Sequence, residues 1–281
     1  MNNQELFEES KKVLVGGVNS PVRAIKPHPF FTEKGEGARI FDAEGKSYVD
    51  YCLAFGPLIL GHNDQDIRQA VEKRLKDGWC FGTATEAEIE FAKFITGHVP
   101  NVDKIRCVST GTEATMTAIR LARGFTGRDK IIKIEGAFHG AHDAVLVKTG
   151  SGGLTHSVPN SRGIPAEVTN NTILIPFNDL DALDAALKKN REQIACMITE
   201  PVIGNAGLIP PKPDYLSNAK KLLSENGSLL ILDEVITGFR LGLGGAQEYY
   251  GVDADIVTMG KVIGGGFPIG VFGARSEIMD N

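Results

Sequence analysis

Short apolar runs alternate with segments of helical periodicity along most of this chain, and no other feature constrains its fold as strongly. The runs that predict strands are Arg106–Val108, Lys130–Ile134, Ala144–Val147, Thr172–Ile175, Ala195–Thr199, Leu229–Leu232, Asp255–Met259 and Val271–Ala274. The segments that predict helices between them are Asp64–Asp77, Glu86–Thr96, Glu113–Arg123, Leu180–Asn190 and Tyr215–Glu225. Continuous apolar strands are typical of sheets buried on both faces. We therefore expect an α/β fold with a mostly parallel central sheet and helices on both faces.

The N-terminal part of the chain has a different pattern. It contains one helical segment, Asn3–Leu14, and two runs that predict a hairpin, Ala38–Asp42 and Ser47–Tyr51, around a turn. We expect a small N-terminal segment over residues 1–60 and a larger domain over residues 61–281. In the larger domain, ligands would bind beyond the carboxyl ends of the parallel strands.

Composition excludes several classes of protein. The net charge of −5 gives no basic surface for nucleic acid. The chain contains no apolar run long enough to span a membrane, and its polar N-terminus resembles neither a signal nor a transit peptide. The four cysteines are scattered and form no CxxC pair, which favours reduced thiols in a cytoplasm over disulfides or a zinc site.

The first candidate binding motif is Ser109–Thr115, which follows a predicted strand and opens a helix. A helix N-terminus offers unpaired N–H donors and a positive dipole end, which suit a phosphate. Gly111 allows close approach of the backbone, and the hydroxyls of Thr110 and Thr112 add donors. An ordinary Ser/Thr N-cap supported by Glu113 explains the same residues.

The second motif is Leu229–Glu234, in which four apolar residues lead directly into Asp233 and Glu234. A carboxylate at the end of a buried strand lies at the ligand-binding edge of the sheet. Such a group can keep a pyridine nitrogen protonated, which makes pyridoxal 5'-phosphate (PLP) an electron sink. The alternative is an acid that caps the next element or binds a metal.

The third motif is Asp255–Lys261, followed by the glycines Gly264–Gly266. A lysine just past an apolar strand is a candidate Schiff-base residue, since partial burial lowers the pKa of its amine. The alternative is a solvated loop lysine. The three motifs together form one arrangement, in chain order: a phosphate site, a pyridine anchor and a reactive amine.

A fourth stretch, Gly136–Gly140, follows the predicted strand Lys130–Ile134. Phe138 could stack on a flat cofactor ring, and we count His139 beside it among the cofactor-binding candidates. The alternative is a core phenylalanine and a hydrogen-bonded histidine. His139, His142 and Asp143 in a glycine-rich loop are poor evidence for a metal site, and no metal is expected.

These motifs resemble those of the fold-type I PLP enzymes, and within them the class III aminotransferase group. Two stretches carry the resemblance to the group, Leu232–Arg240 and Gly260–Gly270, and three narrow it: Gly16–Ala24, Ser109–Arg123 and Val147–Gly152. All five are similar to glutamate-1-semialdehyde aminomutases over essentially the whole chain. The resemblance implies a homodimeric enzyme without nucleic-acid or membrane partners. It would convert glutamate-1-semialdehyde to 5-aminolevulinate for tetrapyrrole synthesis.

The resemblance also assigns roles. Lys261 would bind the cofactor covalently and carry a proton between substrate and cofactor. Asp233 would pair with the pyridine nitrogen, and Val235 would pack on the ring. The phosphate would be held by Thr110, Gly111 and Thr112, and Asn205 would lie near the 3-oxygen of the ring. Ser20 and Arg23 would bind the substrate carboxylate, for which the planar fork of arginine is suited.

A loop over Gly150–Pro165 would close the site over the pyridoxamine phosphate form of the cofactor, from which the reaction starts. The sequence departs from the family pattern at Phe138, where tyrosine is usual, and within Ser157–Pro165. It also ends at Asn281, so we expect the family's C-terminal domain to be absent. Two alternatives stay open: a class III transaminase for another ω- or β-amino substrate, and a truncated chain with little or no activity.

Overall fold

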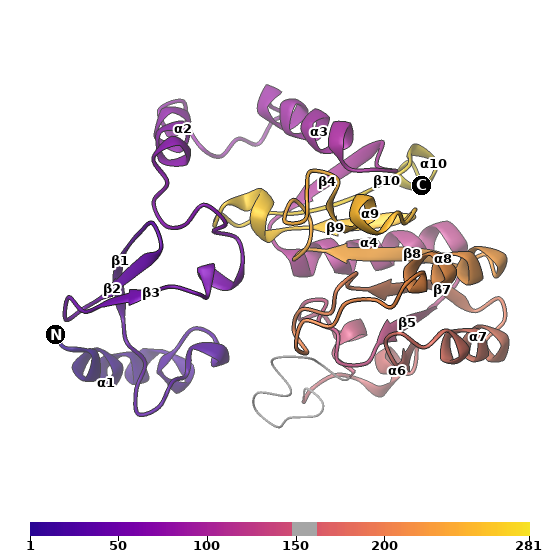
Figure 1. Ribbon diagram of the computed structural model, residues 1–281, viewed down its shortest axis with the longest axis horizontal. Coiled ribbons are helices and arrows are strands. Elements are labelled where there is room, and N and C mark those ends of the chain that lie inside the picture. Colours follow the sequence, from indigo (N-terminus) through magenta and orange to yellow (C-terminus); the bar gives the residue numbers. More distant parts are fainter. Residues whose placement is uncertain (148–161) are drawn as a thin grey trace. The chain divides into compact units, whose positions relative to one another are not determined.

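The computed structural model describes residues 1–147 and 162–281, and these divide into two compact units, Met1–Thr85 and Glu86–Asn281 (Figure 1). The first unit is larger than the expected segment 1–60, because residues beyond position 60 are bonded into it. His62 and Gly37 exchange two backbone hydrogen bonds of 2.8 and 2.9 Å, and His62 Nε2 lies 2.7 Å from Asp50. The second unit accordingly begins later than the expected position 61.

The first unit consists of short elements. Its helices are α1 (Asn3–Val13) and α2 (Gln65–Leu75), with the 3-10 turns η1 (Val15–Gly17), η2 (Pro21–Arg23) and η3 (Leu53–Phe55). Its antiparallel sheet has the order β1 (Thr32–Glu36), β2 (Arg39–Asp42), β3 (Ser47–Val49). The hairpin of β2 and β3 confirms the sequence prediction, whereas β1 was not predicted, because its sequence TEKGE carries no apolar signal.

A seven-stranded sheet forms the centre of the second unit, in the order β4-β10-β9-β8-β7-β5-β6. Its strands are β4 (Lys104–Val108), β5 (Lys130–Ile134), β6 (Thr172–Ile175), β7 (Ile194–Thr199), β8 (Leu229–Glu234), β9 (Ile256–Met259) and β10 (Gly270–Ala274). Strand β10 runs antiparallel to both of its neighbours, β4 and β9, and the other four pairings, from β9 to β6, join parallel strands. The mostly parallel sheet expected from the sequence is confirmed.

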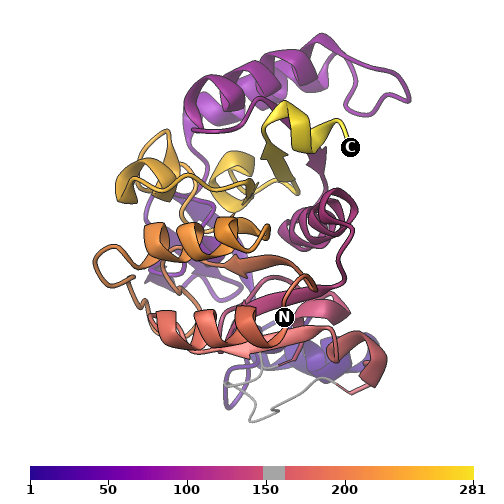
Figure 2. The ribbon, with the colours of Figure 1, turned by 90° about the vertical axis from the view of Figure 1, so that its right-hand side faces the viewer.

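Helices cover both faces of this sheet (Figures 1 and 2). They are α3 (Glu86–His98), α4 (Gly111–Thr126), α6 (Ala166–Thr169), α7 (Leu180–Lys189), α8 (Tyr215–Glu225), α9 (Gly245–Tyr250) and α10 (Ser276–Met279), with 3-10 turns η4 (Asp143–Val145) and η5 (Lys261–Gly264).

Alternate residues of a strand face opposite sides of a sheet, and the side chains of the central strands follow this rule. On β8, Leu230 and Leu232 pack with α3, α7 and α8, while Leu229 and Ile231 pack with α4 and α10.

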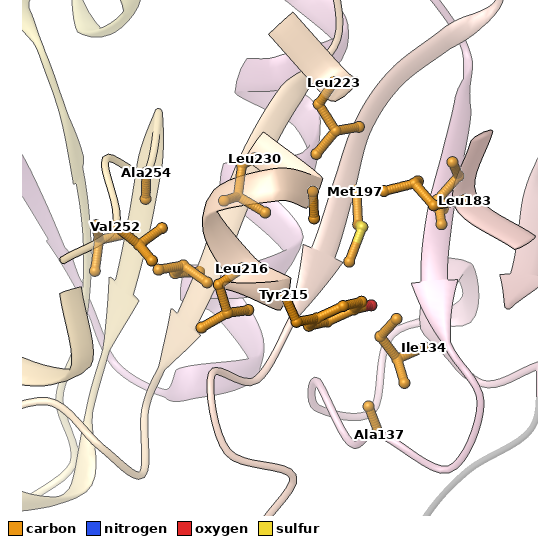
Figure 3. Close-up of a cluster of buried hydrophobic side chains, with 14 of the residues drawn as sticks. Ile134, Ala137, Leu183, Met197, Tyr215, Leu216, Leu223, Leu230, Val252 and Ala254 are labelled. Carbon is orange, nitrogen blue, oxygen red and sulfur yellow. The ribbon is translucent and has the colours of Figure 1, made fainter. Parts of the chain in front are cut away.

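Figure 3 shows the first of these two cores, where α8 lies against the sheet. Tyr215, Leu216 and Leu223 of the helix point toward Met197 and Leu230 of neighbouring strands. Each of these side chains is almost completely shielded from solvent. Two continuous cores of this kind fix the strand ends, and the functional residues follow those ends.

The prediction of a strand over Ala144–Val147 is wrong, since these residues form η4 and a turn. Val145 N donates to His142 O and Leu146 N donates to Asp143 O, so local turn bonds replace a strand ladder. Burial of Ala144 and Val145 beside α4, not sheet pairing, explains the apolar run. Within the described part of the chain, no helix is long and apolar enough to cross a membrane.

Candidate active site

A cavity of about 230 Å³ opens at the carboxyl ends of the parallel strands of the second unit. Thr110, Gly111, Thr112, Thr115, Phe138, His139, Gly140, Glu200, Asn205, Asp233, Val235, Ile236 and Lys261 line it. The lining segments follow β4, β5, β7, β8 and β9, so the sheet brings together stretches that lie far apart in the sequence. Every residue that the sequence analysis assigned to cofactor binding is among them.

Asp233 lies at the end of β8 and is almost completely buried. Its Oδ1 accepts hydrogen bonds from Thr258 Oγ1 at 3.0 Å and from Val235 N at 3.1 Å, and its Oδ2 lies 2.7 Å from His139 Nδ1. A buried carboxylate needs such partners, because its desolvation is costly. The donors hold the carboxylate rigidly at the cavity wall, where it can face a cationic or N–H group.

His139 is fixed at both its side chain and its backbone. In addition to the Asp233 contact, its carbonyl accepts a 2.6 Å hydrogen bond from Thr115 Oγ1 of α4. Its Nε2 is buried and has no hydrogen-bond partner among the described residues. The hydrogen-bonded histidine that we considered as an alternative is therefore present, and it orients the predicted anchor Asp233.

Lys261 follows β9 after one residue, Gly260, and adopts a left-handed backbone, with φ of +45°. Burial lowers the pKa of its amine, an effect that the carboxylates of Asp233 and Glu200 oppose and the Arg240 guanidinium reinforces. A lysine with a lowered pKa has more neutral amine at a given pH, and only the neutral amine is a nucleophile. Because β8 and β9 are adjacent, Lys261 and Asp233 face the same cavity.

Val235 lies close to two glycines on either side of it. A Cβ placed on Gly111 would come within 3.1 Å of the valine side chain, and one placed on Gly260 within 3.3 Å. Both distances are shorter than ordinary carbon contacts, so a larger residue at either glycine would displace Val235. Glycine thus leaves room for Val235 where the start of α4 and the Lys261 loop approach the strand end.

The start of α4 combines the two interpretations of its sequence. Thr110 Oγ1 accepts from Glu113 N at 3.1 Å, and Glu113 Oε2 accepts from the N–H groups of Ser109 and Thr110. This is an ordinary capping box. The N–H groups of Gly111 and Thr112 have no acceptor within the helix, because they belong to its first turn. They can bind an anion at the cavity while Glu113 supports the cap.

Glu234, the second acid of the β8 motif, has a structural role. Its carboxylate accepts from Ala246 N at 2.5 Å, from Gln247 N at 3.0 Å and from Thr237 Oγ1 at 3.0 Å. It therefore satisfies the first turn of α9. Among the described residues, no three His, Cys, Asp or Glu side chains gather into a metal-binding group.

Sequence analysis missed Glu200 and Thr258 as parts of this site. Glu200 follows the buried strand β7, and its carboxylate accepts from Phe138 N at 3.0 Å and Gly204 N at 2.9 Å. Burial raises the pKa of this carboxyl group. An acid directly after an apolar strand was the same signal that identified Asp233, and it was available for Glu200.

Ser20 and Arg23 belong to the first unit, where Arg23 N donates to Ser20 O at 2.9 Å across the turn η2. Their assignment to a substrate carboxylate stays a prediction. Residues 150–161 of the predicted gating loop, Gly150–Pro165, lie outside the part of the chain that the structure describes.

Comparison with known proteins gives concordant results. Residues 21–281 match the family model for class-III aminotransferases. A glutamate-1-semialdehyde 2,1-aminomutase of Archaeoglobus fulgidus is 55% identical over 99% of this chain and 66% of its own length. The structure is similar to that of an omega-transaminase of Sphaerobacter thermophilus, with 37% sequence identity and a TM-score of 0.92, over 99% of this chain and 64% of that one. It is also similar to the structure of a transaminase with PLP bound, with 33% identity and a TM-score of 0.92, over 99% of this chain and 66% of that one. The chain thus spans slightly less than two thirds of the length of the relatives it matches.

Proposed function

The chain belongs to the class-III aminotransferase family, and from this premise we propose that its cavity binds PLP and that the protein is an aminomutase. The proposed reaction is an intramolecular amine transfer from glutamate-1-semialdehyde to give 5-aminolevulinate, the precursor of tetrapyrroles. One observation carries the proposal: Lys261 and Asp233, from adjacent strands, line one cavity together with the N-terminus of α4.

The residues of the cavity fit PLP at each of its functional groups. The first N–H donors of α4 suit the phosphate, because a helix N-terminus binds anions. The buried carboxylate of Asp233 suits a protonated pyridine nitrogen. Val235 and Phe138 offer apolar surfaces for a flat ring, and Asn205 offers a polar side chain for its 3-oxygen. The orphaned Nε2 of buried His139 adds a polar atom for which a bound group could supply the partner.

When bound, PLP supplies an aldehyde that condenses with amines and a pyridinium ring that withdraws electrons from the attached carbon. Asp233, oriented by His139 and Thr258, would keep a proton on the ring nitrogen. Lys261 would hold the cofactor through its amine and, once released, would carry a proton between substrate and cofactor. Its lowered pKa favours this role, since a base must be unprotonated before it accepts a proton.

The choice of aminomutase rests on the similarity of the chain to proteins named glutamate-1-semialdehyde 2,1-aminomutase, at 54–58% identity over nearly its whole length. In this proposal Ser20 and Arg23 bind the substrate carboxylate. The cofactor would enter the cycle in its pyridoxamine form, and the protein would work as a cytoplasmic homodimer.

A class III transaminase for an ω- or β-amino substrate is the second candidate, and the similarity to the omega-transaminase of Sphaerobacter thermophilus favours it. The two differ in what they consume. The aminomutase forms 5-aminolevulinate from glutamate-1-semialdehyde with no added amino acceptor, whereas a transaminase requires a keto acid. Product formed only when a keto acid is present would contradict the aminomutase proposal.

Substitution of Lys261 by alanine tests the binding proposal. We expect the chain to show the absorbance of covalently bound PLP, and Lys261→Ala to lose it, because no other amine is proposed to hold the cofactor. Lys220→Ala, whose side chain contacts Asp255 at the opposite end of β9, is the matched control and should retain the band. A covalent band that survives in Lys261→Ala would remove Lys261 from its role.

A further inference from the structure

Lys133 is a buried lysine that the proposed chemistry does not use. It lies on β5 and its side chain is fully shielded from solvent, which is rare for lysine because desolvation of an ammonium is costly. Its Nζ donates to Ile134 O at 3.2 Å and to Ala137 O at 2.6 Å. Burial lowers its pKa to about 8, so at neutral pH most of the molecules carry the charge.

The carboxylate of Glu200 contacts the same peptide group from its other side. Its Oε1 accepts from Phe138 N at 3.0 Å, while Lys133 Nζ donates to the carbonyl of Ala137. The Ala137 carbonyl and the Phe138 N–H are the two polar ends of one planar amide. A cation at the oxygen and an anion at the N–H therefore fix the orientation of a single peptide, and charged partners make both hydrogen bonds strong.

This peptide would otherwise turn easily, since glycines flank the segment on both sides. Gly136 and Gly140 have φ of +81° and +91°, values that glycine adopts without steric cost. Between them lie Phe138 and His139, which line the cavity, and His139 contacts Asp233. The orientation of one amide thus decides where both side chains point.

We propose that Lys133 and Glu200 act as a positioning pair: together they fix the 137–138 peptide, and with it the two side chains that follow into the cavity. Lys133 does not line the cavity, so it acts through the peptide and not by contact with a ligand. The proposal rests on the proposed function for its effect on PLP, and on the geometry alone for its effect on the peptide.

Two measurements test the effect on the peptide and the effect on PLP separately. The first is hydrogen exchange of the Phe138 and His139 amides in the cofactor-free protein. We expect Lys133→Met, which keeps the length of the side chain but not the charge, to accelerate this exchange about tenfold. Glu200→Gln should act likewise. It removes the negative charge and leaves one acceptor oxygen for the two N–H groups, of Phe138 and Gly204, that the carboxylate now binds.

The second readout is the dissociation constant of PLP, followed by the circular dichroism of the bound cofactor. Each single variant should bind PLP about tenfold more weakly with an altered spectrum. The double variant should be little weaker than the more affected single, since both act on one peptide. Lys220→Met removes a largely buried contact between a lysine of α8 and Asp255, at the end of β9 opposite Lys261, and should lower thermal stability while leaving exchange and PLP affinity unchanged.

The outcomes are distinct. Exchange and PLP affinity within about twofold of the wild type in Lys133→Met would overturn the positioning pair, and if that variant does not fold, the same result in Glu200→Gln would do so. A wild-type protein that does not bind PLP would contradict the proposed function, while accelerated exchange in the variants would still support the pair.

Discussion

The two compact units of the chain differ in how much apolar side chain they bury. In residues 1–85, all of which the structure describes, Pro29 is buried but no Val, Ile, Leu, Met, Phe, Tyr or Trp side chain is, whereas the polar Asn3, Ser10 and Asp42 are. In the second unit, two apolar cores fill both faces of the sheet. Apolar burial is the dominant favourable term in folding, whereas the net contribution of a hydrogen bond is modest. The second unit therefore determines global stability, and the first opens at lower free energy.

Asp42 is the centre of the polar network in the first unit. Its Oδ2 accepts from Tyr48 OH at 2.9 Å and from Asn3 Nδ2 at 3.1 Å, and its Oδ1 accepts from Glu44 N and Lys46 N. One carboxylate thus joins helix α1 to the β2–β3 hairpin. A core of apolar side chains performs the same joining task in the second unit.

The largest expected effect is a loss of folding stability in the second unit. Ile231 is fully buried on β8, so Ile231→Ala should lower the free energy of unfolding by about 2–5 kcal/mol, through lost transfer energy and the cavity left behind. The matched change in the first unit, Ile40→Ala on β2, removes a half-buried side chain and should cost less than about 1 kcal/mol. Urea denaturation measures both. Equal losses would contradict the contrast between the units.

The next effect is local to the first unit. Asp42→Asn removes the charge and leaves at least one of the four donors without an acceptor, so amide hydrogen exchange over residues 30–50 should accelerate about tenfold. The main thermal transition should stay unchanged, because the cores of the second unit are untouched. Glu33→Gln, an exposed carboxylate on β1, is the control. A shift of the main transition with no local acceleration would show that the network is not confined to the first unit.

A smaller effect concerns pH. Burial lowers the pKa of His142 in the second unit to about 4 from an ordinary value of 6.5. Between these values the unfolded chain binds a proton that the folded chain does not, so His142 makes stability decrease as the pH falls from 6.5 to 4. His142→Gln should flatten this part of the profile of thermal midpoints, while His98→Gln, at an exposed position, should not. Parallel profiles for wild type and His142→Gln would exclude this contribution.

The smallest effect is expected on the surface of the first unit. Lys12 and Glu9 form an ion pair of 2.6 Å on α1, with both side chains largely exposed. Solvent screens such pairs, so Lys12→Ala should give no measurable change in the urea midpoint. A clear destabilisation would mean that exposed charges contribute more to the first unit than its buried network suggests.

Prediction from the sequence was most accurate for three elements of the second unit. The limits of β5, β6 and α8 match the expected ranges at both ends. Prediction was wrong at Ala144–Val147, where an apolar run is buried without entering the sheet. The short helices α6, α9 and α10 were missed, because four to six residues carry too little periodicity.

The sequence by itself predicted that Asp233 and Lys261 would lie at one site: each stands where an apolar strand ends, and parallel strands place their carboxyl ends at one edge. Only the tertiary structure decided how these groups are held. The contact of His139 with Asp233 joins residues 94 positions apart, and that of Phe138 with Glu200 joins residues 62 apart. Local patterns carry no information on such pairs, because they form only when strand order in the sheet brings the two loops together.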